Sequence, residues 1–425
     1  MKTTPTSQRD LAVDLARVGC LLIVVAIHVG MVGIGGAELR VSNPLTGWEH
    51  FAVATWLGQV MPLFFLLGGY GAFHAMRRAE GEGTPFAHHV RARVLRIGLP
   101  AVPFFALLAA FGLVLVAAGV PDALADAALE GAGEPLWFMA AFLLCQGLVG
   151  VQYGVVSRRS IMALAWLVTI NLGAIVAVDA WRLASVDAGG STLPGMLNMA
   201  LVWPLLQLAG MLLARGDFDV IRPWGWAVLA IAGLVATATL AGFGEGTRWY
   251  SEDMLTNLNP PTLALVTVGI MHLGLFQLLR PGLRRLAAVR PVQAVLLLVA
   301  PRAMHLYLWH MLVIILVAAG MWALGWDPEP GEAVWWWTRI PVFVVVMLLT
   351  LGLTWPGARL EAVRPRHVVR SRAATALAWT GLAAATLPNL LVTRLGLDVE
   401  LAALGLVLTG VAVTLAWWPD RNPHP

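Results

Sequence analysis

The sequence predicts an all-α, polytopic transmembrane helix bundle of about 12 spans, and three observations support this prediction. Hydrophobic residues make up 59% of the 425 residues and charged residues only 12%, about half the charged share of an ordinary soluble protein. The mean hydropathy is +0.77. Apolar runs near the roughly 20 residues that a membrane-spanning helix needs recur along the chain. So little charge cannot cover a water-facing surface, which excludes a soluble enzyme, a disordered protein and a nucleic-acid-binding domain.

The apolar runs define the expected helices in order. The first run holds Asp14, Arg17 and His28, which make it too polar for a cleaved signal peptide. Segment 292–300 is too short to cross, so we expect an interfacial or re-entrant piece there. The last two spans follow a group of ten and are expected to form, with a short tail, a separate unit over 373–425. The expected spans lie near residues 10–34, 51–75, 94–119, 136–156, 160–179, 194–214, 224–243, 260–279, 303–326, 335–358, 374–392 and 400–418.

The positive charges predict the orientation of these spans. When the loops alternate between the two sides of a membrane, most of the 28 Lys and Arg residues fall on one side. Positively charged loops remain in the cytoplasm, so we expect both termini to be cytoplasmic. The exceptions on the opposite side are Arg40, Arg182, Arg248, Arg339 and Arg394.

The two cysteines give no sign of a metal site or a disulfide framework. Cys20 and Cys145 both lie inside apolar runs, where neither extracellular pairing nor Cys-based zinc ligation is expected. We therefore predict no metal and no bound cofactor.

The first span contains ionisable residues at membrane depth, which indicate function by default. Arg17 and His28 are eleven residues apart, so they differ by only about 20° around a helix and by about 16 Å along it. Asp14 lies within about 60° of both, but about 21 Å from His28. We expect Asp14 to pair with Arg17 at i,i+3. A lone His28 could equally be a packing residue, but its shared face with Arg17 and Asp14 favours a functional role.

A second cluster opens the third span. Arg91 is interpreted as ordinary positive-inside flanking. Arg93 and Arg96 are i,i+3 neighbours at or just inside the apolar boundary, where two guanidinium groups need an anion. The guanidinium fork donates two parallel hydrogen bonds to phosphate. A cytoplasmic polyphosphate, such as the nucleotide part of coenzyme A, would fit this pair.

The ninth span begins with a third polar cluster. It is unusual for one apolar helix to contain three such residues, His305, Tyr307 and His310. The two histidines differ by about 140° around the helix, so they cannot both face one cavity. We therefore expect one of them to be structural.

Two further segments have both a structural and a functional interpretation. Three glycines and Tyr70 follow the aromatic residues of Met61–Gly71, and such glycines allow close helix packing or an unwound stretch beside a ligand. Glu134 precedes Trp137 at the start of the fourth span. Glu134 is either a solvated loop acid or a base at the outer mouth.

Taken in order, these segments resemble the acyltransferase-3 family of integral-membrane O-acyltransferases. The similarity spans residues 9 to about 320 and extends plausibly over 1–370. Gly68 stands where many members have Ser, two spans follow the usual ten, and no extracytoplasmic esterase-like domain is appended. The matching motifs are Arg9…Asp14-x-x-Arg17…His28, Met61–Tyr70, Arg93-x-x-Arg96…Pro100, Trp137-Phe138 and Tyr307-Leu-Trp-His310.

The resemblance implies acyl transfer, most simply of acetyl, from a cytoplasmic acyl-CoA to a hydroxyl of a sugar, glycan or other small acceptor. Residues 1–372 would form the acyltransferase domain of a multi-pass protein of the bacterial cytoplasmic membrane. His28, with Arg17, would be catalytic, and Arg17, Arg93 and Arg96 would bind the donor. Possible acceptor-binding or supporting residues are Asp14, Tyr70, Glu134, Trp137, Tyr307 and His310.

Two other classes of function remain open at this stage. A transporter of an anionic or glycosylated solute could line its pathway with His28 and the arginines, although no internal repeat of the usual transporter kind is visible. An interaction protein or sensor would leave the buried charges unexplained. Release of free CoA thiol would separate an acyltransferase from a transporter.

Overall fold

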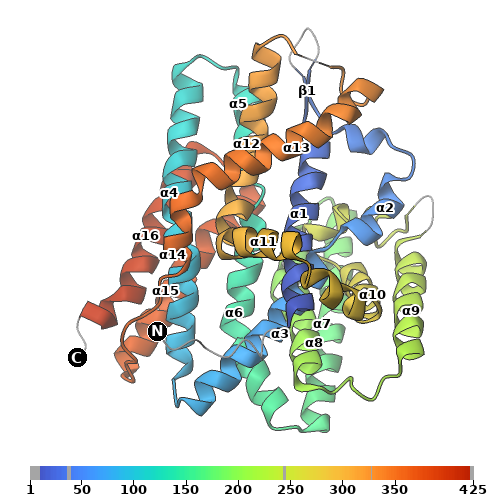
Figure 1. The fold of residues 1–425 in the computed structure, drawn as a ribbon, viewed down its shortest axis with the longest axis vertical. Coiled ribbons are helices and arrows are strands. Elements are labelled where there is room, and N and C mark those ends of the chain that lie inside the picture. The colour runs from blue at the N-terminus through green and yellow to red at the C-terminus, as the bar shows by residue number, and fades with distance from the viewer. Residues whose placement is uncertain (1–9, 36–39, 243–245, 327, 422–425) are drawn as a thin grey trace.

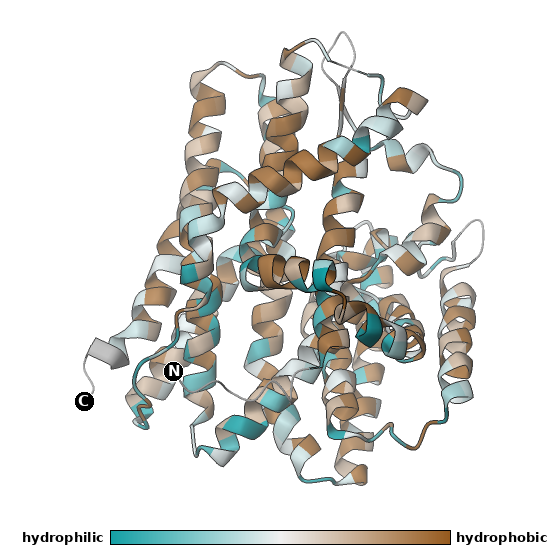
Figure 2. Cartoon of the chain, in the orientation of Figure 1, coloured by the Kyte–Doolittle hydropathy of each residue, from teal (hydrophilic) through white to brown (hydrophobic). Residues whose placement is uncertain are grey.

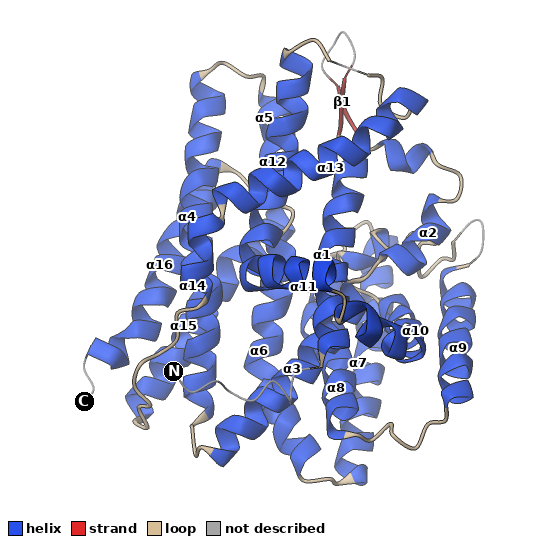
Figure 3. Ribbon diagram, viewed as in Figure 1, coloured by secondary structure: helices blue, strands red, loops and turns tan. Residues whose placement is uncertain are grey.

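The computed structural model describes residues 10–35, 40–242, 246–326 and 328–421, and most of them are helical (Figures 1 and 3). A hairpin of β1 (Gly33–Gly35) and β2 (Arg40–Ser42) pairs Ile34 with Val41 in an antiparallel register. The α-helices are α1 (Leu11–Met31), α2 (Phe51–Gly58), α3 (Met61–Gly81), α4 (Phe86–Ala117), α5 (Asp122–Gly133), α6 (Leu136–Ser157), α7 (Ile161–Asp187), α8 (Val202–Arg215), α9 (Pro223–Ala241), α10 (Leu263–Ala287), α11 (Arg290–Val299), α12 (Ala303–Ala323), α13 (Ala333–Leu353), α14 (Ala358–Glu361), α15 (Arg372–Leu395) and α16 (Val399–Arg421).

Within the described ranges, the structure confirms the all-α class and the expected number of spans. Twelve segments are long and apolar enough to cross a membrane. Apolar residues dominate these helices, and hydrophilic ones gather at helix ends and loops (Figure 2). A protein of this kind is a multi-pass integral membrane protein. The cytoplasmic placement of the termini stays a prediction from the charged loops.

Helix boundaries differ from the expected ones most clearly at the second, third and fourth spans. The second span is broken at Gln59 and Val60 into α2 and α3, with Pro62 in the first turn of α3, where its missing N–H is not needed. The expected loop before the fourth span contains α5, which Pro121 precedes. The α5 sequence is rich in alanine, the strongest helix former, so it folds as a helix despite its charges.

The third span also begins earlier than residue 94. Its helix α4 starts at Phe86, directly after Pro85, and no other proline follows before Pro100. The arginine cluster therefore lies inside a helix. Arg91 is only 1% exposed, and its Nε donates to the carbonyl of Ala416 on α16 at 2.9 Å. The interpretation of Arg91 as a solvated flanking charge was therefore wrong, because α16 covers this face of α4.

Close packing explains the glycine-rich start of α3. A Cβ atom at Gly69 would overlap the carbonyl oxygen of Gln207 on α8, and one at Gly210 would overlap the carbonyl oxygen of Leu66. The two backbones therefore meet without intervening side chains, as small residues permit in membrane helices. This contact confirms the packing interpretation for Gly69, whereas Gly68 and Gly71 line a cavity.

The last two helices lie against the rest of the bundle. In Figure 1 the red and orange helices α16 and α15 run beside α4. Ala385 and Val392 of α15 share a core cluster with Phe104 and Phe105 of α4. Short α11, which covers the expected segment 292–300, runs crosswise to α6 in the same view. The final residues of the expected tail, 422–425, lie outside the described residues.

Candidate active site

Helix α1 positions residues at two separate depths of the bundle, and its N-terminal end is firmly held. The N-cap residue Asp10 accepts a hydrogen bond from the Ala12 N–H at 3.0 Å, which satisfies one of the free donors of the helix start. Its carboxylate also pairs with Arg280 at 2.6 Å and with Arg284 at 2.8 Å. Burial raises the pKa of Asp10, but the hydrogen bonds and charges of these two arginines outweigh burial and lower it to about 2.

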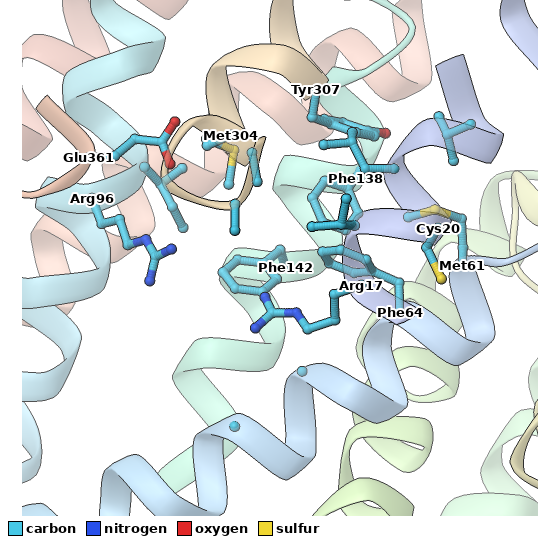
Figure 4. Close-up of a pocket in the computed structure, with 18 of the residues that line it drawn as sticks. Arg17, Cys20, Met61, Phe64, Arg96, Phe138, Phe142, Met304, Tyr307 and Glu361 are labelled. Carbon is cyan, nitrogen blue, oxygen red and sulfur yellow. The ribbon is translucent and has the colours of Figure 1, made fainter. Parts of the chain in front are cut away.

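Residues of α1 from Asp14 to Val24 line a cavity of about 350 Å³, which we call the arginine cavity. Helices α3, α4, α6 and α12 and the loop-side helix α14 complete its wall. Figure 4 shows the guanidinium groups of Arg17 and Arg96 pointing into the same space. The polar residues of its lining are Asp14, Arg17, Arg93, Arg96, Gln146, Tyr307 and Glu361.

Three arginines and two acidic residues line the arginine cavity, so positive charge is in excess there. Arg93 lies within Coulombic range of three other guanidinium groups, those of Arg96, Arg17 and Arg364. Partial burial and then the neighbouring Arg96 lower the pKa of Arg364, which lies in the loop before α15. The Arg17 guanidinium also sits 5.4 Å from the centre of the Phe64 ring, a cation–π contact. The mutual repulsion of the guanidinium groups of Arg93, Arg96, Arg17 and Arg364 favours binding of a polyanion.

Two acidic residues, Asp14 and Glu361, also line this cavity. Glu361 is buried, and its Oε1 accepts from the backbone N–H of His305 at 3.0 Å and contacts His305 Nδ1 at 2.7 Å. Its second oxygen, Oε2, has no hydrogen-bond partner among the described residues. Glu361 therefore holds His305, whereas His310 contacts His28. The two histidines face different surroundings, as predicted.

The other end of α1 lines a second cavity of about 570 Å³, which we call the histidine cavity. Helices α2, α5, α6 and α15, the loop before α10 and the α15–α16 turn contribute to its wall. The ionisable and polar residues of its lining are His28, Gln59, Glu130, Glu134, Trp137, Asn259, Tyr307 and Thr393.

His28 lies between two partners at the wall of this cavity. His28 Nδ1 is 3.1 Å from His310 Nε2, and His310 Nδ1 is 2.6 Å from the carbonyl oxygen of Tyr307. On the other side, His28 Nε2 is 3.6 Å from Glu134 Oε1. Glu134 therefore faces His28, so its interpretation as a merely solvated loop acid was incomplete. His310 itself is only 1% exposed.

This chain of contacts assigns the protons when both rings are neutral. A carbonyl oxygen only accepts, so His310 Nδ1–H donates to Tyr307 and leaves His310 Nε2 as an acceptor. His28 Nδ1–H must then donate to His310 Nε2. The lone pair of His28 Nε2 is consequently free to take a proton at the cavity wall, beside Glu134.

The two cavities meet but are separate. His28 lines only the histidine cavity, whereas Arg17, Arg93 and Arg96 line only the arginine cavity. Three residues belong to both linings: Val24, Met61 and Tyr307. We call these three residues the septum. Among the described residues, His28 and these arginines therefore line different cavities in this conformation.

The structure brings most of the predicted site residues to one cavity or the other. Tyr70 and His310 line neither of them, but His310 contacts His28, whereas Tyr70 lies apart. Its ring packs against His74 at 4.9 Å between centroids, and the Arg280 guanidinium lies 5.8 Å from its centre. Tyr70 thus belongs to the cluster around Asp10. Arg9, which opens the predicted first motif, lies outside the described residues.

Several polar residues of these cavities were not identified from the sequence, Gln146 and Asn259 among them. Gln59 sits at an unpredicted helix break, Glu130 on an unpredicted helix, and Thr393 on one of the two spans expected to form a separate unit. Glu361 follows a span as an ordinary flanking acid would. Only the helix break could have been noticed, because Gln59 and Pro62 interrupt an otherwise apolar run.

The comparisons with known proteins agree with this geometry. A family model described as the acyltransferase domain of the acyltransferase-3 type matches residues 10–359. No curated protein and no solved structure matches the chain. The matched range contains every polar residue that surrounds His28 except those of α15 and the α15–α16 turn. Because this match covers most of its length, the chain belongs to the acyltransferase-3 family and is a membrane-embedded acyltransferase.

Proposed function

We propose that this acyltransferase uses a cytoplasmic acyl-CoA, most simply acetyl-CoA, and esterifies a hydroxyl of a sugar, glycan or other small acceptor. The arginine cavity supports the donor assignment, because Arg17, Arg93 and Arg96 line it together. Guanidinium groups bind phosphate through paired, charge-assisted hydrogen bonds. The anionic nucleotide of acyl-CoA would dock at the end of the bundle that the charge pattern places in the cytoplasm.

The acceptor would enter the histidine cavity, where the lone pair of His28 Nε2 is exposed. A neutral imidazole suits this task because its ordinary pKa lies near 6.5. The Tyr307 carbonyl and His310 hold the proton on His28 Nδ1. They thereby keep Nε2 ready to act as a general base.

The proposed reaction needs no group beyond these side chains and the two substrates. The acceptor hydroxyl gives its proton to His28 Nε2 while its oxygen attacks the thioester carbonyl carbon. The carbon–sulfur bond then breaks, and the departing CoA sulfur takes the proton from the imidazolium. Glu134, 3.6 Å from Nε2, would stabilise the imidazolium between these steps. In a two-step variant, Nε2 accepts the acyl group first and then passes it to the hydroxyl.

The observation that carries this proposal is the hydrogen-bonded orientation of His28 toward a cavity that meets the arginine cavity at the septum. For reaction, the acyl group must pass Val24, Met61 and Tyr307. Met61 is well suited to move, because an unbranched thioether side chain adapts its shape readily.

The direct test measures release of free CoA thiol by membranes supplied with acetyl-CoA and a panel of hydroxylated acceptors. We expect His28→Ala to lower turnover by about 10²- to 10⁴-fold, the usual contribution of a general base, without changing the amount of protein in the membrane. His272→Gln is the matched control, because His272 is a buried intramembrane histidine that lines neither cavity.

Near-normal turnover in His28→Ala would refute the assignment of His28. Acceptor-independent solute flux without release of CoA would instead favour transport, the main alternative suggested by charged residues inside the membrane.

A further inference from the structure

Helix α15 and the turn after it contribute to the site although they lie beyond the residues that the family model matches. The family match ends at residue 359. Val392 and Thr393 of α15, with Gly396 and Leu397 of the following turn, line the histidine cavity together with His28. The end of α15 and this turn therefore form one wall of the cavity, which we call the C-terminal wall.

Glycines on both sides hold the C-terminal wall against α5. Gly396 has a φ of +85°, a left-handed conformation that favours glycine. A Cβ atom there would lie 3.0 Å from Glu130 Oε1. On the α5 side, a Cβ atom at Gly133 would lie 2.7 Å from the Cβ of Leu397. The two elements are thus in direct contact, and Arg91 anchors α16 farther along through the carbonyl of Ala416.

The cavity that this wall completes is acidic. Its described lining includes the carboxylates of Glu130 and Glu134 but contains neither Lys nor Arg. A cleft lined by charges of one sign attracts solutes of the opposite sign and repels those of the same sign. An acceptor that carries a carboxylate or phosphate would be repelled, whereas a neutral or cationic hydroxyl compound would not.

A second observation points to a polar ligand in the same cavity. Gln59 is only 3% exposed, and its Nε2 has no hydrogen-bond partner among the described residues. Its Oε1 accepts from the backbone N–H of Met61 at 3.4 Å, so the amide nitrogen is the group left to serve a ligand. A buried hydrogen-bond donor without a partner costs free energy. An oxygen atom of a bound ligand that accepts this hydrogen bond would remove the cost.

We propose that the C-terminal wall, with Gln59, Glu130 and Glu134, binds and selects a hydroxyl-bearing acceptor that is neutral or cationic and excludes anionic ones. This proposal deepens the proposed function and names the acceptor class for the same site. In this arrangement the end of α15 and the following turn shape the acceptor site, and Glu130 and Glu134 supply its charge.

A charge-selective labelling experiment tests the cavity without any acyl transfer. Thr393→Cys in the full chain places a thiol on the C-terminal wall, and Ala127→Cys places one on α5 across the cavity, where Ala127 also lines it. Each is treated with ethyl methanethiosulfonate reagents that carry either a trimethylammonium or a sulfonate group. The native chain measures background labelling, because Cys20 and Cys145 are both buried. Leu395→Cys is the matched control on α15, since Leu395 is 65% exposed and outside the lining.

We expect both cavity thiols to react at least about tenfold faster with the cationic reagent, relative to the ratio for a small thiol in solution. Adding Glu130→Gln should reduce this preference, and Leu395→Cys should lack it. Failure of Thr393→Cys to label, or equal rates with both reagents, would overturn the proposal.

Attachment of the trimethylammonium group to Thr393→Cys should also raise the KM for the acceptor more than the KM for acetyl-CoA. A cation-selective cavity in a protein that releases no CoA would refute the proposed transfer but leave the cavity assignment standing. CoA release combined with unselective labelling would support the proposed transfer but refute the charge selection by the cavity.

Discussion

The arginine cavity and the histidine cavity differ in charge, although α1 contributes to both. Arg17, Arg93 and Arg96 line the first cavity, and Glu130 and Glu134 line the second. The difference indicates that the bundle sorts its ligands by charge, with an anion on one side of the septum and a neutral or cationic compound on the other. Transfer between the two sides would then be confined to the point where Val24, Met61 and Tyr307 separate them.

The largest effect is expected from filling the septum. Met61→Trp adds an inflexible ring where the acyl group must pass. Because small misplacements of reacting groups cost about 10²-fold in rate, we expect CoA release to fall by at least that factor. The conservative change Met61→Leu should retain most of the rate. Undiminished turnover in Met61→Trp would show that the acyl group takes another route.

A smaller effect is expected from the residue that orients His28. His310→Phe keeps a ring in place but removes the acceptor of the His28 Nδ1–H. We expect kcat to fall roughly 10- to 100-fold through misorientation of the imidazole, with little change in the KM for acetyl-CoA. His310→Gln, whose amide oxygen can accept the same hydrogen bond, should restore part of kcat. Equal losses in both variants would indicate a packing role.

The donor side should respond through binding. Arg96→Gln removes one charge-assisted hydrogen-bonding group, which corresponds to about a tenfold increase in the KM for acetyl-CoA. The salt dependence of that KM should weaken as well. Arg158→Gln is the control, because Arg158 is exposed and lines neither cavity. A change in acceptor KM alone would contradict the division of roles between the cavities.

The smallest effect is expected outside both cavities, at the start of α1. Asp10→Asn keeps a capping oxygen but loses the charge that pairs with Arg280 and Arg284, a loss of about 1 kcal/mol. The pKa of Asp10 is lowered from its ordinary value of 3.8 to about 2. Because the pKa of Asp10 is lower in the folded state than in the unfolded state, its ionised form stabilises the fold at pH values above the unfolded-state pKa. This stabilisation is lost as the pH falls toward the folded-state pKa.

Thermal unfolding in detergent should therefore show the full difference between Asp10→Asn and the native chain above about pH 4. The difference should shrink between about pH 4 and pH 2. Asp187→Asn, which removes a more exposed ion pair with Arg248, should have a smaller effect. A difference that does not depend on pH in this range would exclude the ion pair as its cause.

Much of the site was predictable because membrane-spanning helices have regular geometry. The eleven-residue spacing of Arg17 and His28 placed both on one face of α1, and the structure has both lining cavities. The functional roles of these residues remain predictions. The interpretation of Arg91 failed for a reason that the helix itself does not contain. Arg91 is buried because α16, more than 300 residues later, supplies the carbonyl of Ala416 that accepts from it.

The number of spans, the all-α class and the position of the polar residues within α1 were determined by the sequence alone, because hydropathy and helical periodicity are local properties. Only the tertiary structure decided which groups surround His28. Its partner His310 is 282 residues away, and the wall beyond Glu134 comes from the turn between the last two helices. Cavities form where side chains from distant segments fail to fill the space between helices, and no local pattern records where those segments will meet.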